Sequence, residues 1–252
     1  TDNDRGNMMH IRSAIWKNIS DELTIKFFQR SLSDNVVKIK MIANHDPSES
    51  IITITYKIFG NGLIDIQQEI VTGKEKLPEL PRFGMKMTLP KDFNRVTWFG
   101  RGPHESYWDR KTSAPIKVYS GSVWEQTFPY VRPQETGNKT DVRWMALDNG
   151  TIGLLAIGQP VFDGSVHQYP YEDLENVPGD KRHGKLDIKP KDQIDWLIDY
   201  RQTGVGGDNS WGARTHQKYT LDGKSANYKY HFYLIPFTKG VDIMALSKIN
   251  MN

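Results

Sequence analysis

Three segments of the sequence gather the polar, aromatic and glycine residues from which a ligand site could be built. They are 98–110 (WFGRGPHESYWDR), 129–138 (PYVRPQETGN) and 204–212 (GVGGDNSWG). The first carries imidazole, carboxylate and guanidinium groups, and the second carries a carboxylate and a guanidinium group; such groups can act in acid–base chemistry or bind polar ligands. The same groups can equally form ion pairs that hold a loop, so each segment has a functional and a structural interpretation.

In the segment 98–110, a site containing His104 and Arg110 and a purely structural loop are equally compatible with the sequence. On the structural interpretation, Asp109 and Arg110 form an ion pair with each other, and His104 is simply exposed. In the next segment, two prolines stiffen the loop around Glu135. A hydrogen-bonding role for the Glu135 carboxylate is favoured over a general-acid role.

The third segment has four glycines around a short polar run that ends near Trp211. Glycines at this density allow tight turns, so the loop is expected to display the Trp211 indole rather than pack it. A glycine-rich run can also cradle a phosphate, but only where a helix follows it. Residues 211–216 lead instead into a β-like segment, which disfavours phosphate binding.

The aromatic content favours carbohydrate as a ligand. Seven tryptophans and eleven tyrosines are many for 252 residues, and aromatic faces stack on the apolar faces of sugar rings. Trp16, Trp144 and Trp196 lie within predicted elements and are expected to pack in the core. Trp108 and Trp211 lie among loop residues and are the expected exceptions.

Composition and motifs disfavour several other classes of protein. The 33 basic and 30 acidic residues are scattered, whereas a nucleic-acid binder clusters its Lys and Arg. Cysteine is absent, no His-Glu-x-x-His or Gly-x-Ser-x-Gly motif occurs, and no apolar run reaches the roughly 20 residues of a membrane span. No metal site is predicted, although Asp2-Asn3-Asp4 could hold a hard cation weakly. A soluble protein is expected, in either the cytoplasm or the periplasm.

Hydrophobic periodicity predicts a mostly β fold. Residues 50–59 alternate apolar and polar side chains, the run 60–62 (GNG) predicts a hairpin turn, and the alternation resumes over 64–70. The helical spacing of Met8, Ile11, Ile15 and Ile19 predicts one short helix over 7–19. Further strands are predicted at 37–43, 83–89, 95–99, 142–147, 152–157, 194–200 and 228–235.

About a dozen strands without intervening helices indicate a large antiparallel β-sandwich and exclude a barrel of alternating strands and helices. No linker, repeat or low-complexity tract interrupts 1–252, so a single domain is expected. Long loops on such a rigid sandwich usually carry the binding surface.

Four blocks in this order resemble the C-terminal, "small chain" domain of family 2 β-galactosidases. They are 80–84 (LPRFG), 98–110, 129–138 and 204–211, and the opening run 1–6 (TDNDRG) is similar to a motif from inside that domain. The resemblance implies an all-β fold, the large antiparallel β supersandwich of galactose mutarotases, with one or two short helices. It also implies that the first strands of the domain precede this chain, which would leave a sheet edge exposed and promote self-association.

The resemblance further implies that the parent enzyme hydrolyses terminal β-galactosides with retention, using two glutamates on a separate barrel domain. No Asn-Glu dipeptide, the family's acid/base signature, occurs here. The isolated chain is therefore expected to be inactive, with no cofactor of its own, although the full-length enzyme could use a divalent or monovalent cation. Its expected partners are a β-galactoside, the other domains of the polypeptide and, in the full enzyme, further copies of itself.

Within the domain, the tryptophan of the glycine-rich loop matches Trp211, which the resemblance assigns to the sugar in the leaving-group or acceptor position. Asp208, Asn209 and Ser210 match the same motif and are expected to shape the loop. Glu135, Arg110 and Asp109 match family positions for which a structural role is expected before a functional one.

Two other functions stay open. A free-standing mutarotase-like aldose epimerase would need a histidine and a carboxylate facing the anomeric carbon, and His104, His167 or His183 with Glu135 could supply them. A carbohydrate-binding or assembly module without an active-site role is the second alternative.

Overall fold

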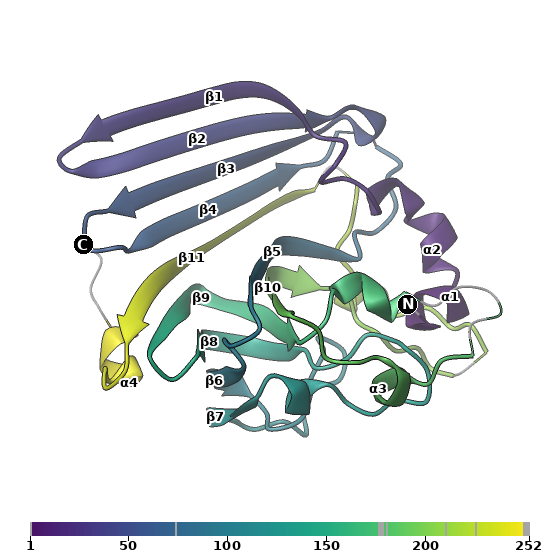
Figure 1. The fold of residues 1–252 in the computed structure, drawn as a ribbon. Coiled ribbons are helices and arrows are strands. Elements are labelled where there is room, and N and C mark those ends of the chain that lie inside the picture. The colour runs from purple at the N-terminus through teal and green to yellow at the C-terminus, as the bar shows by residue number, and fades with distance from the viewer. Residues whose placement is uncertain are drawn as a thin grey trace.

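Eleven strands dominate the structure (Figure 1). The computed structural model describes residues 2–73, 75–175, 179, 181–209, 211–224 and 226–248; Thr1 and Ser210, both singled out above, lie outside these ranges. The strands are β1 (Thr24–Ser33), β2 (Val36–His45), β3 (Ser50–Phe59), β4 (Ile64–Val71), β5 (Arg82–Pro90), β6 (Arg95–Arg101), β7 (Ile116–Ser122), β8 (Lys139–Asp148), β9 (Ile152–His167), β10 (Gln193–Gln202) and β11 (Asn227–Thr238).

The helices are single turns or little more. The α-helices in the described residues are α1 (Asp2–Gly6), α2 (Met9–Arg12), α3 (Gly184–Asp187) and α4 (Ile243–Leu246). Short 3₁₀ turns lie at Ala14–Trp16, Asp46–Ser48, Trp124–Gln126, Tyr171–Leu174 and Gln217–Tyr219. None of these helices is long and apolar enough to cross a membrane.

The strands form one antiparallel sheet in the order β1-β2-β3-β4-β11-β9-β8-β6-β7, with β10 pairing to β9 and β5 pairing to β10. The sheet is bent into two layers, with β1–β4 above and β6–β9 below, and β11 connects them (Figure 1). The expected all-β, antiparallel supersandwich is confirmed.

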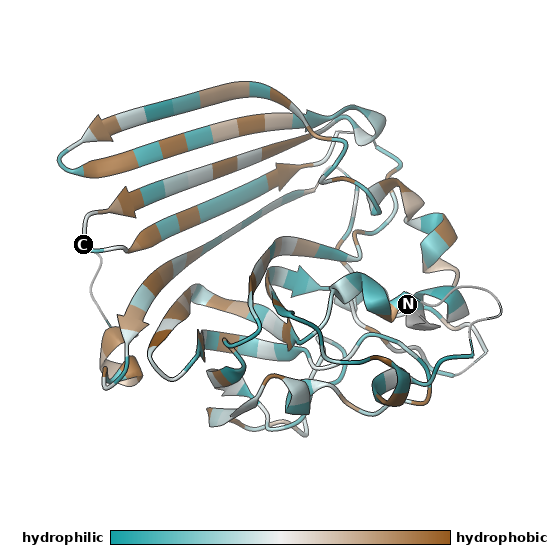
Figure 2. Cartoon of the chain, viewed as in Figure 1, coloured by the Kyte–Doolittle hydropathy of each residue, from teal (hydrophilic) through white to brown (hydrophobic). Residues whose placement is uncertain are grey.

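The main core lies between the two layers. Its buried residues include Ile52 and Ile66 of the upper layer and Trp98, Met145 and Trp196 of the lower strands. The alternation of apolar and polar residues that predicts the strands is visible along β2, β3 and β4 (Figure 2). Trp16, Trp144 and Trp196 are buried, as predicted.

The predicted helix over 7–19 is wrong. Met8 has a left-handed backbone (φ 64°), and Ser13 also leaves the helical region, so the chain forms the short α2 and a separate 3₁₀ turn. Contacts with a distant segment favour this shape, because the Ser13 hydroxyl donates to Glu79 O (3.0 Å) and Trp16 Nε1 donates to Pro78 O (3.2 Å). Tertiary hydrogen bonds thus override the helical periodicity.

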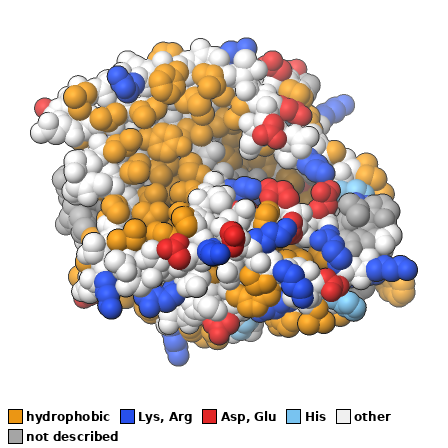
Figure 3. All heavy atoms as spheres, in the orientation of Figure 1, with side chains coloured by type: hydrophobic (Ala, Val, Ile, Leu, Met, Phe, Trp, Pro, Cys, Tyr) orange, Lys and Arg blue, Asp and Glu red, His pale blue; other side chains and the backbone are white. Residues whose placement is uncertain are grey.

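The strands β1 and β7 were not among the predicted ones. Both lie at the ends of the sheet order. Every residue of β1 is exposed, and four of them are large and apolar: Ile25, Phe27, Phe28 and Leu32. Hydrophobic side chains also gather over the upper strands on the face shown in Figure 3, where the surface is hollowed. An exposed sheet edge, as expected from the sequence, is therefore present.

The strands β9 and β10 are largely buried on both faces. In β10, Trp196 and Ile198 face the main core, while Asp195 and Asp199 on the other face are also almost inaccessible. Loop groups contact that second face; for example, the backbone N–H of Tyr171 donates to Asp195 Oδ2 (2.9 Å). The three chemistry-rich segments of the sequence lie mostly in loops, although residues 98–101 belong to β6.

Candidate functional site: a glycine-rich loop that displays a tryptophan

The glycine-rich loop leaves the end of β10 and presents Trp211 to solvent. Trp211 is 93% exposed, the most exposed of the large hydrophobic residues, and its backbone N–H donates to Asn209 Oδ1 (2.8 Å). Asp208 is also exposed, and its Oδ1 lies 2.8 Å from His216 Nε2. The predicted display of Trp211 is confirmed, and Asn209 and Asp208 do shape the loop. No α-helix follows the glycines over 211–216, as predicted, but the β-like segment expected there is absent too: the chain runs irregularly to the 3₁₀ turn Gln217–Tyr219.

Two glycines of the loop are required because other atoms lie very close to their Cα atoms. A Cβ at Gly204 would lie 2.6 Å from Asp109 Cγ, and a Cβ at Gly207 would lie 2.3 Å from the Ala213 carbonyl oxygen. Both distances are shorter than side-chain atoms tolerate. The glycines are therefore needed for the compact shape of the loop.

The Asp109–Arg110 ion pair that the structural interpretation of this segment included does not form, because each residue binds a different segment. Asp109 accepts the backbone N–H groups of Val205 (Oδ1, 3.2 Å) and Gly206 (Oδ2, 2.8 Å). Arg110 donates instead to Glu105 Oε1 (2.5 Å) and to the Tyr130 hydroxyl (2.9 Å).

Glu105 ties the first two segments together. Its side chain is 5% exposed, and it also accepts hydrogen bonds from Tyr130 OH and from the backbone N–H of Gly137 (2.8 Å). Four donors thus meet one buried carboxylate, counting the Thr136 hydroxyl at 3.3 Å. Glu105, which the sequence analysis did not single out as a site residue, is a structural anchor.

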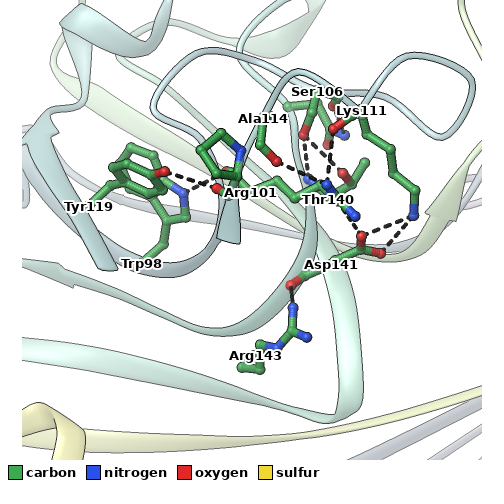
Figure 4. A network of polar contacts seen from close by, with 11 residues as sticks. Trp98, Arg101, Ser106, Lys111, Ala114, Tyr119, Thr140, Asp141 and Arg143 are labelled. Carbon is green, nitrogen blue, oxygen red and sulfur yellow. Dashed lines mark hydrogen bonds and ion pairs between the residues drawn. The ribbon is translucent and has the colours of Figure 1, made fainter. Parts of the chain in front are cut away.

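A second polar network fastens the segment 102–115 to β8 (Figure 4). Arg101 Nε (2.5 Å) and Lys111 Nζ (2.9 Å) converge on the Asp141 carboxylate. These two cations keep the pKa of Asp141 below its usual value, although its burial opposes this. The hydroxyl of Ser106, in the loop, lies 2.9 Å from that of Thr140 on β8. The loop is therefore held rigidly beside the sheet.

Glu135 is buried and acts as a hydrogen-bonding carboxylate. It is 4% exposed and accepts a hydrogen bond from the Tyr171 hydroxyl. Burial raises the pKa of Glu135, while the positive charge of Arg82 opposes the increase. Arg82 in turn pairs with Asp199 Oδ2 at 2.8 Å. The structural role favoured for Glu135 agrees with this environment.

The histidines do not converge with Glu135 in an open site. His104 is exposed and lies 3.2 Å from Ser113 Oγ, as expected for an exposed loop histidine. His183 precedes α3, and its backbone N–H donates to Asp187 Oδ2 (2.6 Å). His167 is inaccessible and contacts the Tyr169 hydroxyl (3.1 Å), and burial lowers its pKa to about 3.

Trp108, expected to be a displayed loop residue, is half-buried. The Arg201 guanidinium lies 4.3 Å from its ring centre, and the Tyr219 ring packs edge-on at 6.1 Å. The glycine-rich loop also borders a cavity of about 290 Å³, which Thr215 lines together with Arg12 and Glu79. Trp211 is thus the only one of the two loop tryptophans that the described structure displays.

Within the described residues, no group of three or more His, Asp or Glu side chains is arranged to hold a metal ion. What the residues of the glycine-rich loop can do is chemically simple: the indole face can contact an apolar surface, and the polar side chains beside it can bond hydroxyls.

Among solved structures, the chain is similar to galactose 1-epimerase from Lactobacillus acidophilus NCFM and to the α-galactosidase from Lactobacillus brevis. The first likeness has 8% identity and a TM-score of 0.44, and covers 84% of this chain and 66% of that one. The second has 12% identity and a TM-score of 0.45, and covers 87% of this chain and 27% of the α-galactosidase chain.

Sequence relatives are much closer. The β-galactosidase of Priestia megaterium is 40% identical over 222 residues, which cover 88% of this chain and 21% of the relative. The β-galactosidase of Lactobacillus delbrueckii subsp. bulgaricus is 31% identical over 230 residues, which cover 90% of this chain and 22% of the relative. The chain therefore spans about a fifth of the length of these relatives. The family model "Beta galactosidase small chain" matches residues 1–234, which confirms the resemblance read from the four motifs: the chain belongs to the β-galactosidase small chain family.

Proposed function

We propose that residues 1–252 form one domain of a larger retaining β-galactosidase, and that Trp211 contacts the sugar in its leaving-group or acceptor position. On this proposal, the first strands of the domain and the catalytic barrel lie elsewhere in the same polypeptide. The single observation that supports a role for Trp211 is its exposure of 93% on a loop of defined shape. A large aromatic side chain is normally buried, so its display on a hydrogen-bonded loop favours a binding role.

The hydrolytic chemistry belongs, in this proposal, to two carboxylates outside the chain. Retaining glycosidases need one carboxyl group that protonates the leaving oxygen and a second that forms the glycosyl-enzyme. Glu135 and Glu105 are both buried and engaged in hydrogen bonds, so neither is available for that work. Any cation that the full-length enzyme uses, and its assembly into a homo-oligomer, likewise involve the remaining domains.

The inactivity of the isolated chain is a direct prediction. We expect no release of nitrophenol from nitrophenyl β-galactoside by purified residues 1–252, because the two carboxylates that retaining hydrolysis needs lie, on this proposal, in another domain. The control is the full-length enzyme under the same conditions. Hydrolysis by the isolated chain that persists through purification and is lost on substitution of one of its own carboxylates would contradict the proposal.

The role of Trp211 is tested in the full-length enzyme with Trp211→Ala and Trp211→Phe. We expect the alanine variant to bind free glucose, used as an acceptor, about tenfold or more weakly, because it loses the stacking and apolar contact of the indole. The phenylalanine variant keeps an aromatic face and should retain part of the affinity. Inhibition by glucose that is unchanged in both variants would show that Trp211 does not contact the acceptor.

The mutarotase alternative finds less support. His167 and Glu135 are buried, and His104 and His183 lie in different loops with other partners, so none of these three histidines faces Glu135 across an open cleft. Polarimetry of freshly dissolved α-galactose with the chain tests this alternative: faster mutarotation would favour it. A binding module without an active-site role would instead leave the kinetics of the Trp211 variants unchanged.

A further inference from the structure

Asp109 lies at the tip of a tight turn that is fixed from both sides. The backbone N–H of Tyr107 donates to Arg110 O (3.1 Å) and the N–H of Arg110 donates to Tyr107 O (2.9 Å), so that Trp108 and Asp109 are the two central residues. Tyr107 is only 1% exposed and anchors the turn in the protein. The turn therefore projects two neighbouring side chains from a rigid base.

Trp108 fastens this turn to the segments that flank the glycine-rich loop. Its ring packs under the guanidinium of Arg201, near the end of β10, and against Tyr219, just beyond the loop. The Tyr219 carbonyl oxygen accepts the backbone N–H of Gly204 (2.8 Å). The two ends of the loop and the turn that carries Asp109 are thus parts of one packed unit.

The Asp109 carboxylate fixes the first part of the glycine-rich loop, at Val205 and Gly206. Its two oxygens accept the successive N–H groups of Val205 and Gly206, and a hydrogen bond from an amide to an ionised carboxylate is stronger than one to a neutral acceptor. The absence of a side chain at Gly204 is what lets the carboxylate approach so closely. A neutral side chain without two acceptor oxygens cannot hold both N–H groups.

The remaining contacts carry this constraint toward Trp211. The Thr215 hydroxyl lies within hydrogen-bonding distance of both the Gly204 (2.8 Å) and Gly206 (2.9 Å) carbonyl oxygens. Farther along, Asp208 contacts His216, and Asn209 accepts the Trp211 N–H. Since the Trp211 side chain is 93% exposed, its position follows mainly from the shape of the loop.

From this arrangement we infer that Asp109 is a positioning residue for the acceptor sugar. It does not touch the sugar; it fixes Val205 and Gly206 so that the loop holds Trp211 in one place. The inference rests on the proposed function of Trp211 and adds a specific dependence: selectivity for a sugar acceptor over water should require the Asp109 carboxylate, 102 residues earlier in the chain.

The test uses the full-length enzyme with Asp109→Ala, Trp211→Ala and the double variant. The measured quantity is the partition of the galactosyl-enzyme between water and added glucose. We expect Asp109→Ala to lower capture by glucose about tenfold while hydrolysis of nitrophenyl β-galactoside changes about threefold or less. In the Trp211→Ala background, Asp109→Ala should lower capture by less than about twofold, because both substitutions remove the same interaction.

The matched control is Asp148→Ala. Asp148 also accepts a backbone N–H, that of Gly150 (2.8 Å), together with Arg95, but it lies at the end of β8 and makes none of the loop contacts. Asp109→Asn is the conservative variant: its single side-chain oxygen can accept one of the two N–H groups, so capture by glucose should fall between the wild type and the alanine variant. The control variant should leave the partition ratio at its wild-type value.

A second readout separates this inference from the role of Trp211. In hydrogen exchange of the full-length enzyme, peptides covering 203–209 should exchange about tenfold or more faster in Asp109→Ala than in the wild type or in Asp148→Ala. Unchanged exchange, or capture losses that are additive in the double variant, would overturn the inference. If residues 203–209 exchange faster in Asp109→Ala but Trp211→Ala does not change capture by glucose, the proposed function of Trp211 is overturned. The structural role of Asp109 in holding the loop would then remain supported.

Discussion

Single carboxylates in the interior couple the stability of the protein to pH. Asp163 is 5% exposed, and burial raises its pKa to about 7, although Arg201 and the backbone N–H of Gln202 oppose the increase. Burial likewise raises the pKa of Asp199 to about 6. Because these values exceed the ordinary value of 3.8, the folded state binds protons more tightly than the unfolded state, and ionisation of either group destabilises the fold.

We predict that Asp163→Asn stabilises the protein at pH 8 relative to the wild type. The difference between 3.8 and about 7 corresponds to about 4 kcal/mol, and the advantage should shrink as the pH falls from about 7 toward 4, where the wild-type carboxyl becomes protonated in both states. The amide keeps an oxygen for the Gln202 N–H. Denaturant unfolding at pH 5 and pH 8 measures the effect, with Asp148→Asn as a less buried control; an equal difference at both pH values would refute the assignment.

At the same scale, the sequence predicts what a residue does when the cause is local. The display of Trp211 and the shaping role of Asn209 follow from the glycines and from the ability of Asn to bond its own backbone two residues on. The partners of Asp109 were not predictable, because peptide N–H groups 96 and 97 residues away leave no signal in side-chain types. The burial of Asp163 and His167 could not be predicted from the sequence either, because it depends on the loops that cover β9.

At the scale of elements, the strands with one buried face were predictable and the edge strands were not. The segment that forms β3 alternates apolar and polar residues and gives the observed bounds, whereas β1 places Phe27 and Phe28 side by side and buries neither. The helix expected over 7–19 failed because Ser13 and Trp16 hydrogen-bond to the 78–79 backbone. Such contacts form only in the tertiary structure, so the spacing of apolar residues along the sequence does not predict them.

The exposed edge strand β1 should make the isolated chain self-associate. Its outer edge has no partner strand in the described structure, and Phe28 is 62% exposed on it. We expect Phe28→Lys to shift sedimentation velocity profiles toward monomer, because a charge on an edge strand disfavours strand-to-strand pairing. Ser31→Lys, on the same strand, adds a charge without removing an apolar side chain and separates the two effects. Exposed sheet edges associate at roughly micromolar to millimolar concentrations, so the test is made at about 100 µM. An unsubstituted chain that is monomeric at this concentration would contradict the prediction.

At the scale of the whole molecule, the sheet topology explains why the chemistry-rich segments lie on one side. The strands β9 and β10 are buried on both faces, and the segments 102–115, 129–138 and 168–174 cover the face that looks away from the main core. Asp109 and the glycine-rich loop meet there although they are distant in sequence. The motifs predicted the family and the all-β class; the meeting of the loops required the strand order, in which β10 pairs with both β5 and β9.

This organisation separates two tasks within the proposed enzyme. On the proposed function, the sandwich and its buried carboxylates hold the loops, and the loops present one aromatic face to a sugar that is cleaved on another domain. The chain spans about a fifth of its relatives' length.

The most direct test of this account is the partition of the galactosyl-enzyme between glucose and water in the full-length enzyme carrying Trp211→Ala. The account predicts that capture by glucose falls about tenfold or more, while the rate at which nitrophenol is released from nitrophenyl β-galactoside changes about threefold or less. A partition ratio equal to that of the wild type, or an equal loss of both reactions, would contradict it.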